Sequence, residues 1–226
     1  MALHRTVRVA LPALTLFGMA ACSDSGSGRG TVGVRLTNAS VGASVVSEVA
    51  AALTETPLPA ESVKSIDIFV VRVDVKREEP SEEAAAEATE ESASEQAGWV
   101  TIAEPNALFD LMTLAGGTNT FLGDAEVAVG SYRGFRLIID PAKSSVTLND
   151  EANTVIGGES ITGLKFPSAA QTGIKIKLSG GPVIVEDGET STLVVKFDVS
   201  RSFVMLGSSI EQNGLLFKPV IHGTQE

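Results

Sequence analysis

The strongest constraint on the fold of this chain is the alternation of apolar and polar residues in short runs. In GIKIKLS, residues 173–179, two isoleucines and a leucine alternate with two lysines. In TSTLVVKFDVS, residues 190–200, every second residue from Leu193 to Val199 is apolar. A period of two places one set of side chains on each face of a β-strand. The pattern therefore predicts strands with one face in a core and the other in solvent.

Further runs rich in valine, isoleucine and threonine are separated by glycine, asparagine, aspartate and proline. Strands are expected at residues 30–37, 63–75, 98–104, 132–140, 173–179, 190–200 and 213–222. In the second of these the apolar parity changes after Val70, which predicts a β-bulge or a strand covered on both faces. The last begins with Asn213-Gly214, a dipeptide typical of hairpin turns. Many short strands with frequent turns indicate an all-β fold, an antiparallel sandwich or barrel.

Two segments depart from this pattern. Residues 43–55 carry apolar side chains at helical spacing, which predicts one short helix between the first two strands. Residues 106–114 place three leucines on one side of a helical turn, and we expect a second short turn there.

The chain begins with a short positive segment and an uncharged apolar run. Arg5 and Arg8 precede VALPALTLFGMAA, residues 9–21, which contains no charged residue. This order of segments is typical of a secretory signal peptide. The apolar run is too short to span a bilayer core, which needs roughly 20 apolar residues. We therefore expect residues 1–21 to be a lipoprotein signal peptide that is removed from the mature protein.

Cys22, the single cysteine of the chain, directly follows Ala20-Ala21. This resembles the lipobox of bacterial lipoproteins, in which a lipid such as palmitate is attached to the thiol and cleavage occurs just before the cysteine. The match departs from the usual pattern at Met19, where leucine is common. Each buried methylene contributes about 0.8 kcal/mol, so two or more acyl chains hold a protein firmly on a membrane. The alternative is ordinary secretion with a free thiol at Cys22.

Residues 22–30 would then join the lipid to the folded body, because their serine and glycine content is that of a flexible tether. Ser23 follows the cysteine, whereas aspartate at that position favours retention at the inner membrane of Gram-negative bacteria. We expect a lipid-anchored protein at the cell membrane or outer membrane, facing the periplasm or the exterior.

Charge narrows the choice of partners. Without residues 1–21 the chain keeps 15 basic and 28 acidic residues, a net charge of −13. Such a body is a poor partner for nucleic acid or anionic lipid. Eight glutamates and no large apolar residue occur in residues 78–97. That segment cannot bury enough apolar surface to offset the entropy cost of ordering it, so we expect a disordered acidic loop. The loop would lie within a single domain of residues 31–226.

Eight landmarks of the body occur in a recognisable order. They are GTVGVRLTNASV, IDIFVVRVDV, GWVTI, FDLMTL, VAVGSYRGFRLIID, FPSAAQTGIKI, LVVKFDVSRSFV and GLLFKPVI. Their order and spacing over roughly residues 30–222 resemble a prokaryotic lipoprotein family catalogued as the domain of unknown function DUF4382. The resemblance implies a single antiparallel β-sandwich like the prealbumin-type modules of bacterial surface proteins. It implies no catalytic residue, because the family name assigns no activity.

Catalysis has few candidate residues. His222 is the one histidine left after the signal peptide, and its place in the last strand is more typical of a strand end than of a general base. A zinc site needs several histidine or cysteine ligands, so we expect no metal and no other cofactor. Paired carboxylates could cleave an envelope polysaccharide, and this hydrolase is kept as an alternative. Its candidates are Asp67, Asp74, Asp110, Asp140 and Asp198, the last expected to be solvated beside Lys196.

The main hypothesis is a non-enzymatic envelope module that binds a protein or glycan partner, with its oligomeric state left open. Aromatic rings stack on sugars, and Trp99 and Tyr132 are the weak candidates for such a site, although Trp99 is expected in the core. The scarcity of aromatic residues favours a protein partner. A third reading is a divalent-ion site among the loop acids Asp124, Glu126, Asp150 and Glu151.

Overall fold

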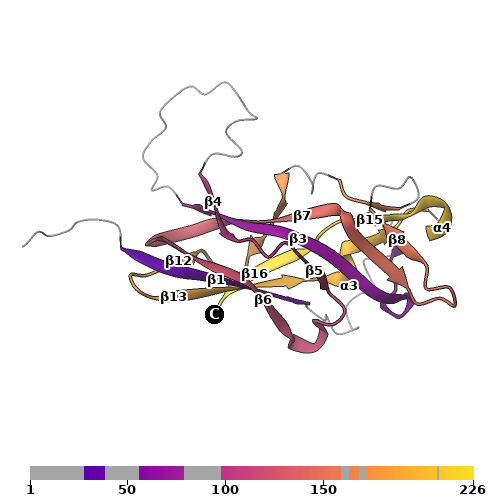
Figure 1. Ribbon diagram of the computed structural model, residues 1–226, viewed down its shortest axis with the longest axis horizontal. Helices are drawn as coiled ribbons and strands as arrows, with labels where there is room; N and C mark the ends of the chain where they lie inside the picture. Colours follow the sequence, from indigo (N-terminus) through magenta and orange to yellow (C-terminus); the bar gives the residue numbers. More distant parts are fainter. Residues whose placement is uncertain (1–27, 39–55, 79–97, 159–162, 168–171, 208) are drawn as a thin grey trace, which may run out of the picture.

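The computed structural model describes residues 28–38, 56–78, 98–158, 163–167, 172–207 and 209–226. The signal peptide, Cys22, the expected helix at 43–55 and the acidic run after Glu78 lie outside these residues. The described part is mostly β-structure. Two sheets pack face to face around one core, and a smaller third sheet lies at the end of the sandwich away from the start of β1 (Figure 1).

The first sheet has five strands. In spatial order they are β11 (Lys177–Leu178), β16 (Ile221–Gln225), β13 (Thr190–Phe197), β1 (Arg29–Asn38) and β6 (Asn119–Ala128). β1 is parallel to β13 and antiparallel to β6, so the first strand of the body lies inside the sheet and not at its edge.

The second sheet has seven strands and is built around the long pair β3 and β7. Its main path is β10 (Ile174–Lys175), β7 (Gly130–Leu148), β3 (Val63–Arg77) and β4 (Trp99–Ala103). The strands β12 (Val183–Val185) and β8 (Val155–Gly157) pair with β7, and β5 (Ala107–Asp110) pairs with β3. Both faces of this sheet carry buried residues, a point that matters for the site described below.

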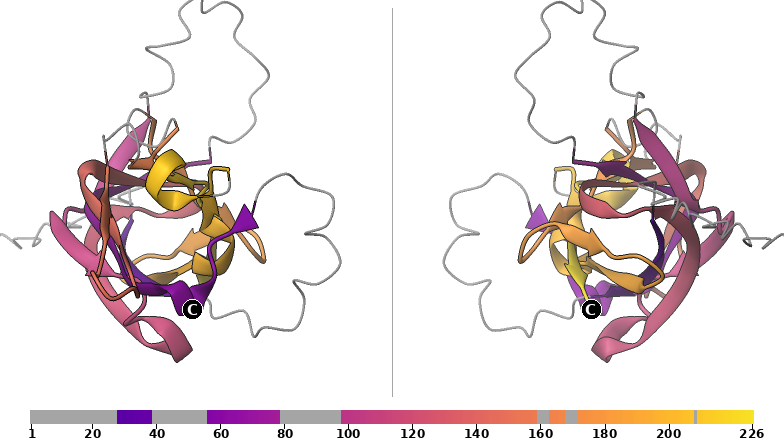
Figure 2. Two further views of the ribbon diagram at one scale, coloured as in Figure 1. Left: turned by 90° about the vertical axis from the view of Figure 1, so that its right-hand side faces the viewer. Right: turned by 90° about the vertical axis from the view of Figure 1, so that its left-hand side faces the viewer.

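The third sheet contains β2 (Thr56–Pro57), β14 (Phe203–Met205), β15 (Leu215–Phe217) and β9 (Leu164–Lys165). Two four-residue helices, α3 (Val199–Ser202) and α4 (Ile210–Asn213), flank β14, and the 3-10 turns η2 (Ala60–Ser62) and η3 (Ala115–Gly117) complete the described elements. The end-on views show the layers curving around the core (Figure 2).

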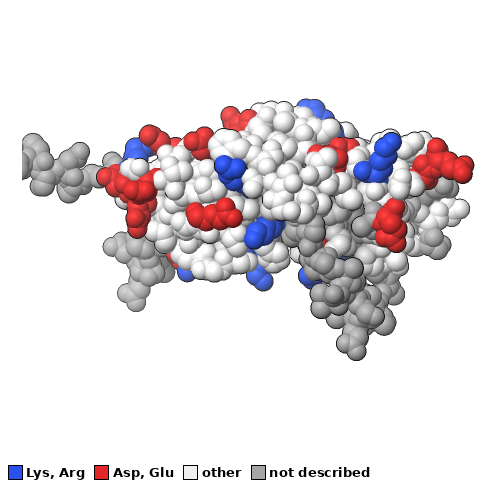
Figure 3. Space-filling view, turned by 90° about the horizontal axis from the view of Figure 1, so that it is seen from below, with Lys and Arg blue, Asp and Glu red and all other residues white. Residues whose placement is uncertain are grey.

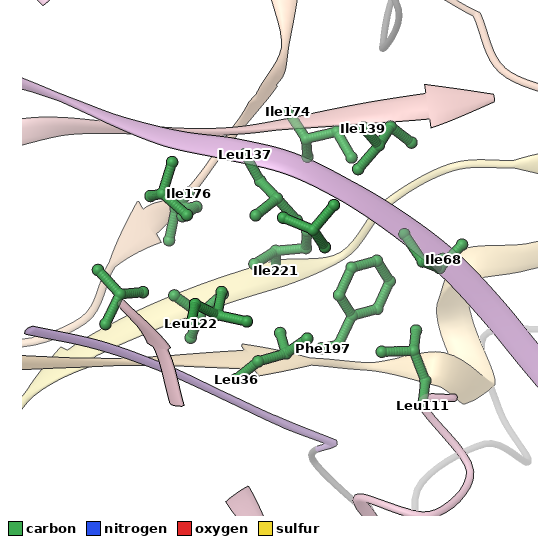
Figure 4. Close-up of a cluster of buried hydrophobic side chains, with 14 of the residues drawn as sticks. Leu36, Ile68, Leu111, Leu122, Leu137, Ile139, Ile174, Ile176, Phe197 and Ile221 are labelled. Atoms are coloured by element: carbon green, nitrogen blue, oxygen red, sulfur yellow. The ribbon is translucent and has the colours of Figure 1, made fainter. Parts of the chain in front are cut away.

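The alternation of apolar residues is what forms the core. Leu36 and Phe197 from the five-stranded sheet face Ile68 and Leu137 from the seven-stranded sheet, and all four are at most 1% exposed (Figure 4). At the end near the third sheet, the ring of Phe217 lies 5.1 to 5.8 Å from three other phenylalanine rings. Aromatic pairs at such distances add to the stabilisation that burial alone provides.

The prediction of an all-β sandwich is confirmed. The expected bulge is also present, because the β3–β7 register shifts between Val70 and Arg72. The sheets are mixed, however, since β1–β13, β11–β16 and β15–β9 are parallel pairs. Parallel neighbours are distant in sequence, and the alternation of residues carries no information on strand direction.

The expected helical turn at 106–114 is wrong in its first half. Residues 107–110 form β5, where Leu108 is 52% exposed, whereas Leu111 and Leu114 are buried. Asn213-Gly214 does end the connection between the antiparallel strands β14 and β15. It does so as the end of α4, with Gly214 at φ +78°, a region that favours glycine, and not as a two-residue hairpin turn.

No helix among the described residues is long and apolar enough to cross a membrane.

Candidate functional site

A cluster of charged side chains is buried on the outer face of the seven-stranded sheet. Asp74 of β3 lies directly opposite Thr101 of β4 and Arg136 of β7. Its carboxylate accepts a hydrogen bond from Arg136 Nε at 2.9 Å and from Thr101 Oγ1 at 2.8 Å. Arg72, two residues earlier on β3, donates its Nε to Oδ1 at 3.0 Å. We call these residues, with Trp99, the Asp74 cluster.

Trp99 covers the cluster. The guanidinium carbon of Arg136 lies 4.4 Å from the centre of a Trp99 ring, a cation–π arrangement. Trp99 is half-buried on the outer face and does not belong to the core between the sheets. A Cβ on Gly134 would come within 2.8 Å of the Lys76 Cβ and 3.3 Å of the Trp99 ring, so the indole packs closely over Gly134.

Strand geometry explains why these side chains meet. Val73 and Val75 of β3 point into the core at 0% exposure, so Asp74 between them points outward. The β3–β4 register shifts between Val73 and Asp74, which aligns Asp74 with Thr101. Asp74 is nevertheless only 2% exposed, because the long side chains of Arg72 and Arg136 close around it.

The contacts of the Asp74 cluster favour a fixed ion-pair network over a catalytic carboxylate. Both oxygens of Asp74 already accept hydrogen bonds from arginine, and Oδ1 accepts a further one from Thr101. Arg136 also donates to the carbonyl oxygen of Thr172, at 3.5 Å. Charge-assisted bonds of this kind join β3, β4 and β7 and bring Thr172, two residues before β10, onto the same face.

Sequence reasoning found Asp74 and Trp99 but missed Arg72, Thr101 and Arg136. The sequence feature that could have pointed to the missed residues is a polar residue at an outward-facing position in each of three strands. Their contact depends on the register between strands that are up to 62 residues apart. No spacing in the sequence gives that register, so the cluster could be recognised only in the fold.

Tyr132 occupies a different environment. Its side chain is 4% exposed and packs in the core, and its hydroxyl donates to the carbonyl oxygen of Ala128 at 2.7 Å. Burial raises the pKa of this phenol, while the nearby charges of Arg77 and Arg29 act in the opposite direction. The two aromatic candidates are thus on opposite faces of the seven-stranded sheet and do not form one site.

Two of the remaining aspartates proposed for hydrolysis are neighbours on paired strands, and a third lies on β7. Asp67 and Asp110 are cross-strand partners on β3 and β5. Asp110 Oδ1 accepts hydrogen bonds from the backbone N–H groups of Ile66 at 3.2 Å and Met112 at 2.9 Å, which fixes the turn after β5. Asp140 lies on β7, where Lys143 approaches it to 3.3 Å.

The expectation that Asp198 is solvated beside Lys196 is corrected by the structure. β13 ends at Phe197, so the alternation of the strand no longer applies to Asp198. Asp198 is 4% exposed and accepts a hydrogen bond from Ser200 Oγ at 2.8 Å, with Arg201 at 3.8 Å. Its carbonyl oxygen accepts a bond from Ser202, so the residue organises the start of α3.

The acids proposed as a divalent-ion site lie on different elements. Asp124 and Glu126 are on β6, whereas Asp150 and Glu151 are in the turn between β7 and β8. Hydrogen bonds from the side chain and backbone of Thr154 lower the pKa of Asp150. In the ranges that the structure describes, no three histidine, cysteine, aspartate or glutamate side chains are grouped to hold a metal ion.

Glu78 is the one residue of the acidic run 78–97 that the structure describes. Its carboxylate accepts hydrogen bonds from Ser131 Oγ at 2.8 Å and from Arg133 Nε at 2.7 Å. The Ser131 bond, and after it the Arg133 bond, lower the pKa of Glu78. The run therefore begins from an anchored, ionised residue at the end of β3.

Comparison with known proteins adds one finding. A family model described as a domain of unknown function, DUF4382, matches residues 30–219. No curated protein and no solved structure matches the chain. The resemblance in the sequence landmarks is confirmed by the family match, whereas the likeness to prealbumin-type modules stays a prediction.

Proposed function

The chain belongs to the family of the domain of unknown function DUF4382, and from its N-terminal sequence we propose that it is a lipid-anchored, non-enzymatic lipoprotein of the cell envelope. In this proposal Cys22 carries the lipid, and the β-sandwich binds a protein or glycan partner close to the membrane.

The observation that carries the proposal is the position of Cys22 relative to the fold. Cys22 follows an uncharged apolar run and Ala20-Ala21, and β1 begins at Arg29, seven residues later. A fully extended chain of that length spans at most about 25 Å. A lipid on Cys22 would therefore hold the start of the sandwich within about that distance of the bilayer surface.

The side-chain contacts support binding over catalysis. The buried carboxylate of Asp74 is occupied by Arg72, Thr101 and Arg136, and that of Asp198 by Ser200 and Arg201. A general acid or base must be able to reach the substrate proton. A rigid sandwich with two broad outer faces is, by contrast, a suitable scaffold for recognition.

Anchoring is tested by metabolic labelling with an alkyne analogue of palmitate, comparing the native chain with Cys22→Ser. We expect label and membrane association in the native chain and loss of both in the variant. Ser23→Ala serves as the control for mutation near the cleavage site and should retain the label. Membrane association of an unlabelled native chain, or label that survives Cys22→Ser, would contradict the proposed anchor.

Partner binding is tested by crosslinking in living cells followed by mass spectrometry, again with Cys22→Ser as the control. Capture of one specific envelope component by the anchored form supports a recognition module. Capture of the same component by both forms would show that recognition does not need the anchor. A turnover of polysaccharide by the purified chain that Asp74→Asn or Asp110→Asn abolishes would overturn the non-enzymatic assignment.

A further inference from the structure

Three cationic or titratable side chains form a row across the outer face of the five-stranded sheet. Lys177 of β11 is the register partner of His222 of β16, and His222 is the register partner of Lys196 of β13. The sequence neighbours Ile176, Ile221 and Val195 are at most 4% exposed and point into the core. The three members of the row therefore point away from the core, and we call them the basic row.

The basic row is not neutralised within the described structure. Among the residues described, neither lysine has an ion pair or side-chain hydrogen bond, and the same holds for His222. Lys177 and Lys196 lie on either side of β16, with His222 between them. The two lysines are therefore available to an anionic ligand, although the body as a whole carries a net charge of −13.

The positive surface continues from the basic row towards the sheet edge. Arg35 of β1 lies on the same face, where its guanidinium is 5.9 Å from the ring centre of Phe121 on β6. Phe121 is 53% exposed. Arg35 also donates to Asn119 at 2.9 Å, so its head group is held in place beside an accessible ring.

Acidic residues lie on the same sheet face, but at its other end. Asp124 and Glu126 of β6 pair with Gly33 and Thr31 near the start of β1. The basic row aligns with Thr37, which is four residues beyond Gly33 and six beyond Thr31, or about 13 Å and about 20 Å at the rise of a strand. On the face seen in Figure 3, acidic side chains lie at both ends and basic side chains are interspersed with acidic ones over the middle.

We propose that the basic row, extended by Arg35 and Phe121, is a binding surface for a polyanionic glycan. Lys177 and Lys196 are separated by two strand spacings, about 10 Å, so they can contact successive acidic groups of one polymer. Lysine is depleted in protein–protein interfaces, which makes a protein partner the poorer fit. The acidic residues further along the face oppose a flat approach to an anionic bilayer. This inference depends on the proposed function in one respect: the cell envelope is where the protein would meet such a polymer.

The test uses the purified full chain and a fluorescent oligomer of polygalacturonate as the probe, with binding read by anisotropy at low salt. The double variant Lys177→Gln/Lys196→Gln should bind about tenfold more weakly, the effect expected for two exposed charge contacts. The matched control Lys64→Gln/Lys165→Gln changes charge equally at distant strands and should stay within about twofold of the native affinity. Added salt should weaken native binding.

Several results would overturn the proposal. The first is no measurable binding of polygalacturonate, and the second is an equal loss of affinity in both double variants. The third is tighter binding of a polyglutamate peptide of the same charge than of polygalacturonate. Stronger association with vesicles containing phosphatidylglycerol than with the oligomer would assign the surface to the membrane instead. Urea unfolding of each variant confirms that the fold is retained. Because the assay needs no lipid anchor, its failure and a failure of Cys22 labelling are read independently.

Discussion

Asp74 and Arg136 lie directly opposite each other on β3 and β7 and form an ion pair of 2.9 Å between Oδ2 and Nε. Their side chains are 2% and 5% exposed, although both point to the outer face of the sheet. Burial of two charges requires that each keeps its partner, because an unpaired buried charge costs several kcal/mol. The pair therefore makes the outer face of β3 and β7 sensitive to single substitutions.

Replacing Asp74 by asparagine should destabilise the protein by about 3–5 kcal/mol, because Arg136 stays buried without its counter-charge. The midpoint of urea unfolding measures the effect. Asp124→Asn is the control, since Asp124 is exposed on β6 and should shift the midpoint little. Equal shifts for the two variants would show that the Asp74 cluster does not contribute as its geometry indicates.

Trp99→Ala should cost about 1–2 kcal/mol, because it removes the cation–π contact with Arg136 and uncovers the cluster. Val100→Ala, at the exposed neighbouring position, should cost clearly less. Because Trp99 is the single tryptophan, its fluorescence reports on this cluster alone. Asp74→Asn should change the emission of Trp99 in the folded protein. An unchanged spectrum would argue against contact between Trp99 and the Asp74 cluster.

Adjacent glycines on and after β8 should respond oppositely to alanine. A Cβ on Gly158 would overlap the carbonyl oxygen of Pro141, so Gly158→Ala should destabilise by about 1–3 kcal/mol. A Cβ on Gly157 meets nothing within 4 Å, and Gly157→Ala should be neutral or stabilising by roughly 0.5 kcal/mol. Thermal unfolding of the two variants tests the pair, and similar losses in both would refute the difference.

The pKa of Glu78 in the folded protein should lie below its ordinary value, chiefly because of the Ser131 hydrogen bond. A carboxyl group with a lowered folded pKa stabilises the fold above its unfolded pKa, and this contribution is lost as the pH falls through the folded pKa. Carbon-detected NMR titration measures the value. Ser131→Ala and Arg133→Ala should each raise the pKa of Glu78, and an unchanged pKa in Ser131→Ala would contradict the assigned cause.

The alternation of residues predicted those strands in which one face meets the core. In residues 173–179, Ile174 and Ile176 are buried at 5% and 4% exposure, as their parity requires. The expected single strand is nevertheless divided into β10, which pairs with β7, and β11, which pairs with β16. The strand β6 was not predicted, since its apolar residues Leu122 and Val127 are five positions apart and a register shift falls at Leu122. A bulge changes parity, and a pattern search over one segment cannot detect which partner strand causes it.

The candidate site was harder to predict from the sequence than the fold was. Asp198 was expected in solvent because the strand pattern was extended to residue 200, three residues past the true end of β13. The Asp74 cluster and the basic row each combine residues from three strands, and their members meet through register alone. Register depends on the whole set of pairings in a sheet, so single-strand reasoning identifies the residues without identifying their neighbours.

The position of β1 between β6 and β13 also constrains how the protein reaches its native state. Thr31 pairs with Thr190, so the parallel partner of the first strand is among the last segments to be synthesised. Contacts between distant segments slow folding, because the intervening loop must close before any contact is gained. The five-stranded sheet cannot be completed on a partial chain, which keeps a nascent polypeptide open until residues 190–225 are available.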